Sequence, residues 1–437
     1  MKTSIWLSGL SLMVVGLLSV SAHAQGDYIV HEWGTFTSVQ GGDGELLSWR
    51  PLQTSELPAF VYNWNRPGLN RLHVGPSTGS KVAMVTLQRM ETPVIYFYSS
   101  YDMNVDVSVD FPRGLITEWY PQATQIGPSR PLDPNIHTTA TLGQSRAVWK
   151  NIRLLAPKMD YTVDAARLPQ DKSGSHYFAA RETGSDLVQM DYAGLTNSVT
   201  EYDKFIFYRG AGSFKTPLRV KVDATDAVTA ANTGTDDLAH LFLVSVHDNG
   251  GGKTAAFTVL KTVAPGASIV CPELHPANFV PLDKFQAEIS DQMRAALIDA
   301  GLFKSEAAAM VNTWKDSWFS EEGDRVLYIL PRAWTDETLP LTLDPKPMKL
   351  VRVMVGRAEI ITPRAASELS GNLTRAAKGD QPAHELAAHQ LRAFGRFAEP
   401  ALRLASPPDN SNNALSVGYQ ILSETPQPSG LVSSKPE

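Results

Sequence analysis

The chain has 437 residues, 43% of them hydrophobic and 19% charged, with a formal net charge of −6 at pH 7. A chain of this length is long enough for two or three domains, each with a core of its own. The mild acidity argues against nucleic acids and against anionic membrane surfaces as partners.

The first 24 residues have the pattern of a cleavable signal peptide. Lys2 gives a basic start, Ile5 to Val20 is mostly apolar, and Ala22 to Ala24 is a small-x-small cleavage site. The mature chain is expected to begin at Gln25, which is not a cysteine and therefore does not indicate a lipid anchor. No later stretch has the ~20 apolar residues that cross a bilayer, so we expect no transmembrane anchor in the mature chain and a periplasmic or extracellular location.

Cys271 is the only cysteine, so the exported chain must fold without an internal disulfide. It follows an apolar run that resembles a strand end and precedes Pro272. A buried thiol is therefore favoured over a nucleophilic one, because free cysteine is among the most buried residue types.

Residues 25–125 are predicted to form an N-terminal β-sandwich-like domain. Tyr28 to Gln40 is expected to be a strand, followed by a glycine-rich turn. Met103 to Phe111 alternates strictly between apolar and polar residues, as a strand with one buried face does. Together with Pro93 to Tyr98 and Leu115 to Tyr120, it is expected to form a β-meander.

Residues 145–265 are predicted to form a second β-rich domain. Its expected strands are Ser145 to Lys158, Tyr177 to Arg181, Asp186 to Tyr192, two within Lys204 to Asp223, and a hairpin of Leu241 to Val246 with Ala255 to Val263. The segment from Lys204 resembles the first meander in pattern. This indicates either two related sandwiches or only the pattern that amphipathic hairpins share.

Residues 266–405 change to helical periodicity. A helical hairpin with a break at Gly301 is expected, then the strands Arg325 to Leu330 and Leu350 to Ile361, then the helices Ala366 to Leu373 and Glu385 to Leu404. Residues 406–437 are predicted to be a mobile tail. The predicted fold is thus mainly β, with one or two antiparallel β-sandwich-like domains and an α+β C-terminal part.

Glu91 and Glu118 are the candidate catalytic residues, since both are flanked by apolar side chains. Two carboxylates in unlike environments are what glycoside cleavage needs, one as acid and one as base or nucleophile. The alternative is a structural ion pair of Glu91 with Arg89 or Arg113.

The candidate binding residues are His31, Glu32, Trp33 and Trp119. His31 and Glu32 are adjacent, and in a strand they point to opposite faces, so they are not expected to serve one site together. Tryptophans stack on sugar rings when exposed and fill a core when buried, and core packing is the favoured reading here.

No cofactor and no metal are predicted. His384 and His389 lie five apart, about 140° around a helix, which rules against an HExxH zinc site. A site built from His31, His247 and Asp248 is a minor alternative. No nucleophile elbow, phosphate loop or dinucleotide fingerprint is present in the sequence.

The segments HEWGTFTSVQGGDG, RMETPVIYFYS, GLITEWYP, TWKDSWF and YILPRAW resemble those of a family of uncharacterised exported bacterial proteins. That resemblance implies export and little else, and no functional residue is carried over from it. We therefore expect an exported β-rich protein that binds a surface polymer, such as a polysaccharide, or a cell-surface partner protein. A carbohydrate-active hydrolase using Glu91 and Glu118 is the alternative.

Overall fold

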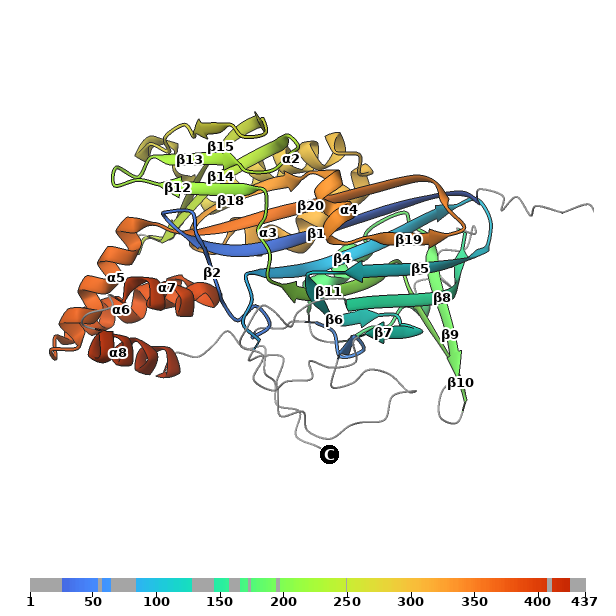
Figure 1. Cartoon of the computed structure of the whole chain (residues 1–437), viewed down its shortest axis with the longest axis horizontal. Helices are drawn as coiled ribbons and strands as arrows, with labels where there is room; N and C mark the ends of the chain where they lie inside the picture. The colour runs from blue at the N-terminus through green and yellow to red at the C-terminus, as the bar shows by residue number, and fades with distance from the viewer. Residues whose placement is uncertain are drawn as a thin grey trace, which may run out of the picture.

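The computed structural model of the chain describes residues 26–53, 57–63, 84–127, 145–156, 166–171, 174–193, 197–248, 250–406 and 411–424. Figure 1 shows a β-rich body with the C-terminal helices gathered at one end. The predicted signal peptide lies outside the described residues.

The largest element of the fold is an eleven-stranded sheet. Its order is β17-β15-β14-β18-β20-β1-β4-β11-β6-β3, with β2 paired to β1. These strands are β1 (Gly26–Gly41), β2 (Leu46–Leu47), β3 (Tyr62–Asn63), β4 (Gln88–Ser99), β6 (Gly114–Tyr120), β11 (Ile206–Gly212), β14 (Leu238–Asp248), β15 (Lys253–Val263), β17 (Val280–Pro281), β18 (Gly323–Leu330) and β20 (Pro347–Ile361).

At the centre of this sheet, the first strand of the described chain pairs with the last one. β1 pairs in parallel with β20 from Ile29 opposite Lys349 to Gly41 opposite Ile361, and antiparallel with β4 on its other side. The three predicted ranges 25–125, 145–265 and 266–405 all contribute strands to this one sheet. The boundaries between the predicted domains therefore do not coincide with boundaries between sheets.

A second sheet of six strands lies beside the first. Its order is β10-β9-β8-β5-β19, with β7 paired to β8. Its strands are β5 (Met103–Phe111), β7 (Gln125–Gly127), β8 (Ser145–Leu155), β9 (Leu187–Ala193), β10 (Ser198–Asp203) and β19 (Leu341–Asp344).

The predicted meander is wrong, although each of its three strands is present. β4 and β6 belong to the large sheet with β11 between them, whereas β5 pairs with β8 and β19. β6 is buried on both faces, and β4 is buried on both faces up to Phe97, but β5 alternates. Strands with such different burial occupy different sheets, and β5 turns its valines inward while its other face meets solvent.

A small third sheet consists of β12 (Leu218–Val222), β13 (Val228–Asn232) and β16 (Ser268–Val270). The hairpin of β14 and β15 is confirmed. Tyr177 to Arg181, predicted as a strand, is a 3-10 helix, η3 (His176–Arg181). The Ser175 side chain accepts a hydrogen bond from the Tyr177 N–H and so caps this turn, an effect of serine that favours a helix start over a strand.

The predicted helical hairpin is confirmed as α2 (Leu282–Asp299) and α3 (Lys304–Phe319). Gly301 joins the two helices at a φ of 110°, where a side chain would be strained. α2 packs on the large sheet, with the Phe285 ring 5.7 Å from that of Phe257. The short helices η4 (Pro276–Asn278) and α4 (Arg332–Thr338) flank this region in the sequence.

The C-terminal helices are α5 (Pro363–Ala376), α6 (Gln381–Ala393), η5 (Gly395–Phe397), α7 (Ala398–Ala405) and α8 (Ser411–Glu424). The helix predicted from Glu385 to Leu404 is broken at Gly395, which has a φ of 51°. α8 lies within the segment predicted as a mobile tail, and its Ala414 and Ile421 are buried among α5 to α7. Residues 425–437 lie outside the described part of the chain.

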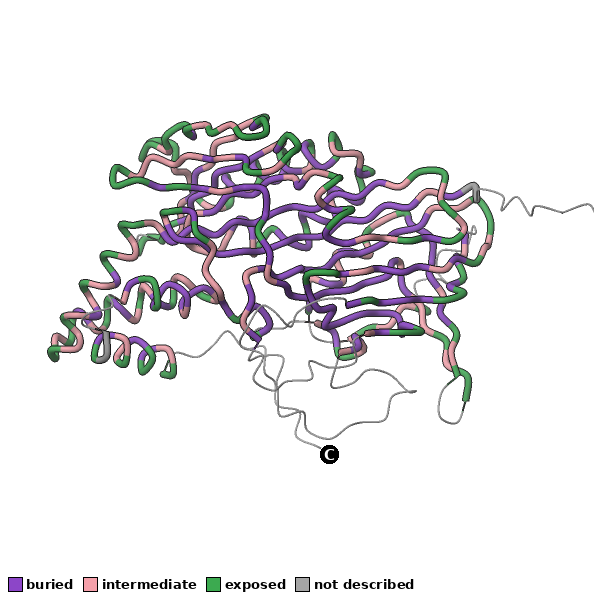
Figure 2. The backbone as a smooth tube through the Cα atoms, in the orientation of Figure 1, coloured by how far each residue is buried: buried purple, intermediate pink, exposed green. Residues whose placement is uncertain are grey.

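Two large apolar clusters, and a small third one, fill the part of the fold that the structure describes. The largest one lies between the sheets and under α2 and α3, and the second one lies among α5 to α8 and contacts Val39, Trp49 and Ile361. Figure 2 shows the buried backbone concentrated in the sheets and the exposed segments at turns and helix surfaces. The C-terminal helices thus meet the sheets where β1 and β20 end.

Candidate functional site

Glu91 lies in β4 with its side chain enclosed by cationic groups. Thr37 Oγ1 donates a hydrogen bond of 2.6 Å to Oε1, and Arg396 Nη1 donates one of 3.0 Å to the same oxygen. Arg89 Nε lies 3.4 Å from Oε2, and Glu91 is only 3% exposed. Burial works against ionisation, but the two arginines and Thr37 outweigh it and hold the pKa of Glu91 well below its usual range.

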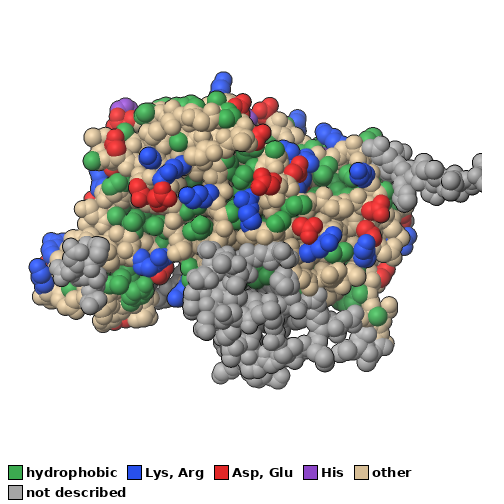
Figure 3. Space-filling model, in the orientation of Figure 1, with side chains coloured by type: hydrophobic (Ala, Val, Ile, Leu, Met, Phe, Trp, Pro, Cys, Tyr) green, Lys and Arg blue, Asp and Glu red, His purple; other side chains and the backbone are tan. Residues whose placement is uncertain are grey.

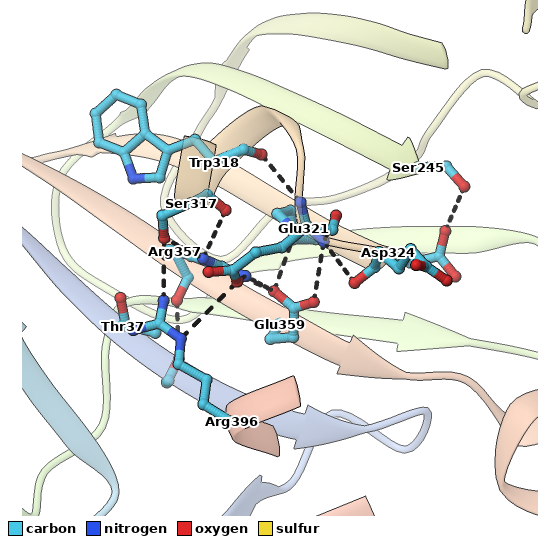
Figure 4. Close-up of polar contacts among 12 residues, drawn as sticks. Thr37, Ser245, Ser317, Trp318, Glu321, Asp324, Arg357, Glu359 and Arg396 are labelled. Carbon is cyan, nitrogen blue, oxygen red and sulfur yellow. Dashed lines mark hydrogen bonds and ion pairs between the residues drawn. The ribbon is translucent and has the colours of Figure 1, made fainter. Parts of the chain in front are cut away.

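A cluster of arginines and carboxylates continues from Glu91 along β20 and β18. We call it the buried charge cluster, made of the following residues: Thr37, Arg89, Glu91, Ser317, Glu321, Arg325, Arg357, Glu359 and Arg396. Figure 4 shows most of these side chains pointing toward one another from β1, β18, β20, the end of α3 and η5. The cluster therefore ties the C-terminal helices and α3 to the centre of the large sheet.

Local sequence explains how the cluster forms. Arg357 and Glu359 are two apart in β20 and so share a face, and Arg325 of β18 lies directly opposite Glu359. Arg325 Nε donates to Glu359 Oε2 at 3.1 Å, and Arg357 Nη2 donates to the same oxygen at 2.7 Å. One carboxylate thus neutralises part of the charge on two guanidinium groups.

The end of α3 supplies further acceptors. Arg325 Nη1 donates to the Trp318 carbonyl at 3.0 Å, and Arg357 Nη1 donates to the Ser317 carbonyl at 2.8 Å. The last carbonyls of a helix have no partner within the helix and carry partial negative charge, so they attract cations. Asp324, next to Arg325, lies apart from these partners and bonds to Ser245, and burial raises its pKa.

Glu118 of β6 is held in a second buried ion pair. Arg209 of β11 donates to both carboxylate oxygens at 3.1 Å, and Thr117 also donates to Glu118. Glu118 is 1% exposed. Of the predicted structural partners for Glu91, Arg89 is in contact, whereas Arg113 bonds to Thr338 instead.

These arrangements give the hydrolase hypothesis no support. Glycoside cleavage needs one carboxyl that keeps its proton near neutral pH. The pKa of Glu91 is lowered, which is the opposite of what a catalytic acid needs. Glu91 and Glu118 are both buried and paired with arginines, and they lie on β4 and β6, the two strands on either side of β11. The geometry is that of structural ion pairs.

His31 and Glu32 point to opposite faces of β1, as predicted. His31 Nδ1 lies 2.7 Å from Glu306 Oε2, and Tyr98 donates to the other oxygen of the same carboxylate at 2.7 Å. Glu32 accepts from Tyr208 at 2.5 Å and from Arg352 on the other side of the sheet. Both residues are fully buried.

Trp33 and Trp119 are also fully buried. Trp33 packs beside Tyr96, and Trp119 stacks with Tyr62 at a ring distance of 6.5 Å. Neither indole is available to a surface ligand in this structure. All four predicted binding residues therefore belong to the core.

The residues discussed for a metal site do not meet. His247 bonds to Ser245 and lies against Phe279, while His31 contacts Glu306. Within the described ranges, no group of three or more His, Cys, Asp or Glu side chains is placed to hold a metal ion. Cys271 is buried, and burial raises the pKa of its thiol.

The arginines of the cluster were missed by the sequence analysis. The sequence nevertheless contains a sign of buried charge. Arg357 and Glu359 interrupt the mostly apolar second half of β20, and every residue from Val351 to Ile361 is buried. Charged side chains are almost never fully buried unless they are paired, so such positions predict internal ion pairs.

Comparison with known proteins gives no family. No protein-family model and no curated protein matches the chain. Among solved structures, it is similar to the Fcho1 mu homology domain of Danio rerio with bound Eps15 peptide, at 7% identity over 78% of this chain and 100% of that chain, with a TM-score of 0.29.

It is also similar to the yeast delta-COP-I mu-homology domain. The complex with a Dsl1 WxWxV peptide matches at 6% identity over 77% of this chain and 99% of that chain, with a TM-score of 0.24. The same domain without the peptide matches at 7% identity over 77% and 98% of the two chains, with a TM-score of 0.25. Such low scores carry no inference about the function of this chain. Within its described residues, no helix is long and apolar enough to cross a membrane.

Proposed function

We propose that the protein is exported and binds a partner polypeptide, which pairs as an extra strand with the outer edge of β15. Export rests on the signal-peptide pattern of residues 1–24 and on the resemblance to exported bacterial proteins. The binding mode rests on one observation, the open edge of the large sheet at β15.

The open edge extends from Ala256 to Thr262. On its inner side β15 pairs with β14 almost along its whole length. On its outer side, within the described chain, only Thr254 and Ala255 have a strand partner, the two-residue strand β17. Phe257 to Leu260 are half-buried, and Lys261 and Thr262 are exposed, so solvent reaches this edge.

The chemistry of a strand edge favours a polypeptide over a polysaccharide. The edge presents backbone N–H and C=O groups in a regular row, which an extended polypeptide matches with its own row. The half-buried Phe257, Val259 and Leu260 would add apolar contacts to the partner's side chains. Lys261 lies near one end of the edge, where a charge limits uncontrolled pairing between copies.

The test uses the mature chain from Gln25. Peptides selected from a random displayed library would be bound to it, and amide hydrogen exchange would be measured with and without peptide. We expect slowed exchange within residues 256–262. Protection elsewhere, or binding to a polysaccharide and peptidoglycan panel without peptide binding, would overturn the proposal.

A charged edge variant makes the test specific. Thr258→Lys with Leu260→Lys is expected to weaken peptide binding at least tenfold, because the two ammonium groups would have to be desolvated on strand pairing. Thr342→Lys is the matched control. Thr342 is exposed on β19, the edge strand of the other sheet, so its substitution is expected to leave peptide binding unchanged.

A further inference from the structure

Glu321 is the place where the buried charge cluster reaches solvent. Its side chain is 41% exposed, whereas those of Arg357 and Arg396 beside it are 0% and 13% exposed. Glu321 follows α3, and Figure 4 draws its side chain among those of Arg357, Glu359 and Arg396. A half-exposed carboxylate thus lies beside two largely buried guanidinium groups.

The fit of Glu321 to the two arginines is incomplete. Arg357 Nη2 donates to Glu321 Oε2 at 2.6 Å, but Arg396 Nε is 3.9 Å from the same oxygen. Arg396 Nε is buried and has no hydrogen-bond partner among the described residues. A buried donor without an acceptor is costly, so a better placed acceptor at this position would stabilise the structure.

The two guanidinium groups are held in place by their other contacts. Both donate to Ser317 Oγ, Arg357 at 2.6 Å and Arg396 at 3.2 Å. Both also lie over the Phe397 ring, at 5.3 and 5.1 Å from its centroid. These contacts hold the two guanidinium groups in addition to their contacts with Glu321.

We propose that Arg357 and Arg396 form a binding site for a carboxylate ligand, and that Glu321 occupies this site in the free protein as a tethered competitor. An untethered carboxylate that displaces Glu321 into solvent accepts hydrogen bonds from Arg357 Nη2 and Arg396 Nε together. The charge of the cluster is unchanged by the exchange, because one carboxylate replaces another.

The nature of the present occupant defines the ligand class. The site holds a carboxylate now, and two donors from neighbouring guanidinium groups suit the two oxygens of a carboxylate. The carboxylate can belong to a small free acid or to an acidic side chain of a peptide, since both present the same group. This inference does not depend on the strand-addition proposal, which concerns the edge strand β15, whereas Arg357 lies on the central strand β20.

The experiment measures binding to the full mature chain with two probes, sodium propionate and the peptide acetyl-Ala-Glu-Ala-amide. Acetyl-Ala-Gln-Ala-amide and sodium chloride at equal ionic strength serve as ligand controls. Arginine Nε–H resonances followed by NMR report on the site directly. We expect weak binding by the wild-type chain and at least tenfold tighter binding by Glu321→Gln, which removes the competitor and keeps its size.

Two further variants make the result specific. Glu322→Gln is the matched control, because Glu322 is adjacent and its carboxylate lies 3.7 Å from Lys253 instead of near the arginines. In the Glu321→Gln background, Arg396→Lys keeps the charge but removes the Nε donor, and it is expected to reverse the gain. If Glu321→Gln does not fold, Glu321→Asp tests the same point by withdrawing the carboxylate.

The two probes and the variants distinguish between the possible ligands and test the proposal itself. Tighter binding of propionate alone assigns the site to small acids, and tighter binding of the glutamate peptide assigns it to acidic polypeptides. No gain in Glu321→Gln or Glu321→Asp over Glu322→Gln, or a gain that survives Arg396→Lys, would overturn the proposal.

Discussion

Two regions of the molecule use the same kinds of ion pair in opposite surroundings. In the buried charge cluster, Arg357 and Arg325 share Glu359 in the interior. On the outer face of β5 and β8, three pairs join exposed or half-exposed side chains, namely Arg146 with Asp110, Lys150 with Asp106 and Arg153 with Asp102. Figure 3 shows that acidic and basic side chains are interspersed on the molecular face drawn there.

Burial, and not the number of pairs, determines how much an ion pair contributes to stability. Water screens the outer pairs, so each contributes little to stability. In the cluster, removal of one partner leaves the others charged and without water, and the loss is large. The cluster therefore fixes the position of the C-terminal helices, whereas the outer pairs mainly keep the face of the six-stranded sheet soluble.

The largest expected effect is that of Arg357→Met. It removes the shared partner of Glu321 and Glu359 and leaves the buried Glu359 with less compensation. We expect a loss of about 3 to 5 kcal/mol in the free energy of unfolding, measured by urea denaturation. A loss below about 1 kcal/mol would mean that the cluster is not different from a surface pair.

Glu91→Gln is expected to have the next largest effect, a loss of about 2 to 4 kcal/mol at pH 7, because Arg396 and Arg89 lose their counter-charge. The pH dependence gives a second readout. The pKa of Glu91 is lowered on folding, so its contribution is present above the unfolded value of about 4.3 and is lost as the pH falls.

Unfolding measured from pH 7 to pH 3 should therefore show a smaller decrease for Glu91→Gln than for the wild-type chain. Glu321 contributes in the same direction, since the nearby arginines lower its pKa to about 2. Equal slopes for variant and wild type would contradict the low pKa of Glu91.

Asp186 provides the reverse case, a buried carboxylate for which burial is the dominant influence. It accepts a hydrogen bond from the Ser99 N–H at 2.7 Å, but burial raises its pKa to about 7. The folded state then binds this proton more tightly, so the contribution of Asp186 to stability is greatest below about pH 4 and is lost as the pH rises from about 4 to 7.

Asp186→Asn is therefore expected to raise the free energy of unfolding by about 1 to 3 kcal/mol at pH 8 and to change it little at pH 4. Thermal unfolding at the two pH values measures the difference. If Asp186→Asn is destabilised equally at pH 4 and pH 8, the ionised Asp186 carboxylate is stabilised by its hydrogen bonds in the fold, and the expected gain at pH 8 is wrong.

The smallest effect is expected for Lys150→Met in the outer pairs. Its ammonium group lies 2.7 Å from Asp106, but the lysine side chain is 59% exposed. We expect a change of about 0 to 1 kcal/mol, which decreases further in 0.5 M salt. A loss as large as that of Glu91→Gln would remove the distinction between the two regions.

The strands themselves could largely be predicted from local pattern. Met103 to Phe111 alternates, and the strand has the predicted bounds. The opposite directions of His31 and Glu32 also follow from the period of a strand. Sheet membership could not be predicted, because it depends on partners far away, such as β20 for β1 and β19 for β5.

The candidate site was predicted less well than the fold. Glu91 was identified as unusual, but its partner Arg396 is 305 residues away, and no local pattern links them. The apolar neighbours of Glu91 indicate burial, which alone would raise its pKa, whereas the nearby arginines and Thr37 lower it below its usual value. The open edge of β15 likewise follows from the order of strands and from no feature of residues 253–263 alone.

The parallel pairing of β1 with β20 has a consequence for the order of assembly. Roughly 300 residues separate the two strands in the chain. At a synthesis rate of about 5 to 20 residues per second, the first strand waits about 15 to 60 seconds for its neighbour. Until β20 is present, one side of β1 has no strand partner, so the centre of the large sheet forms only when nearly the whole chain is available.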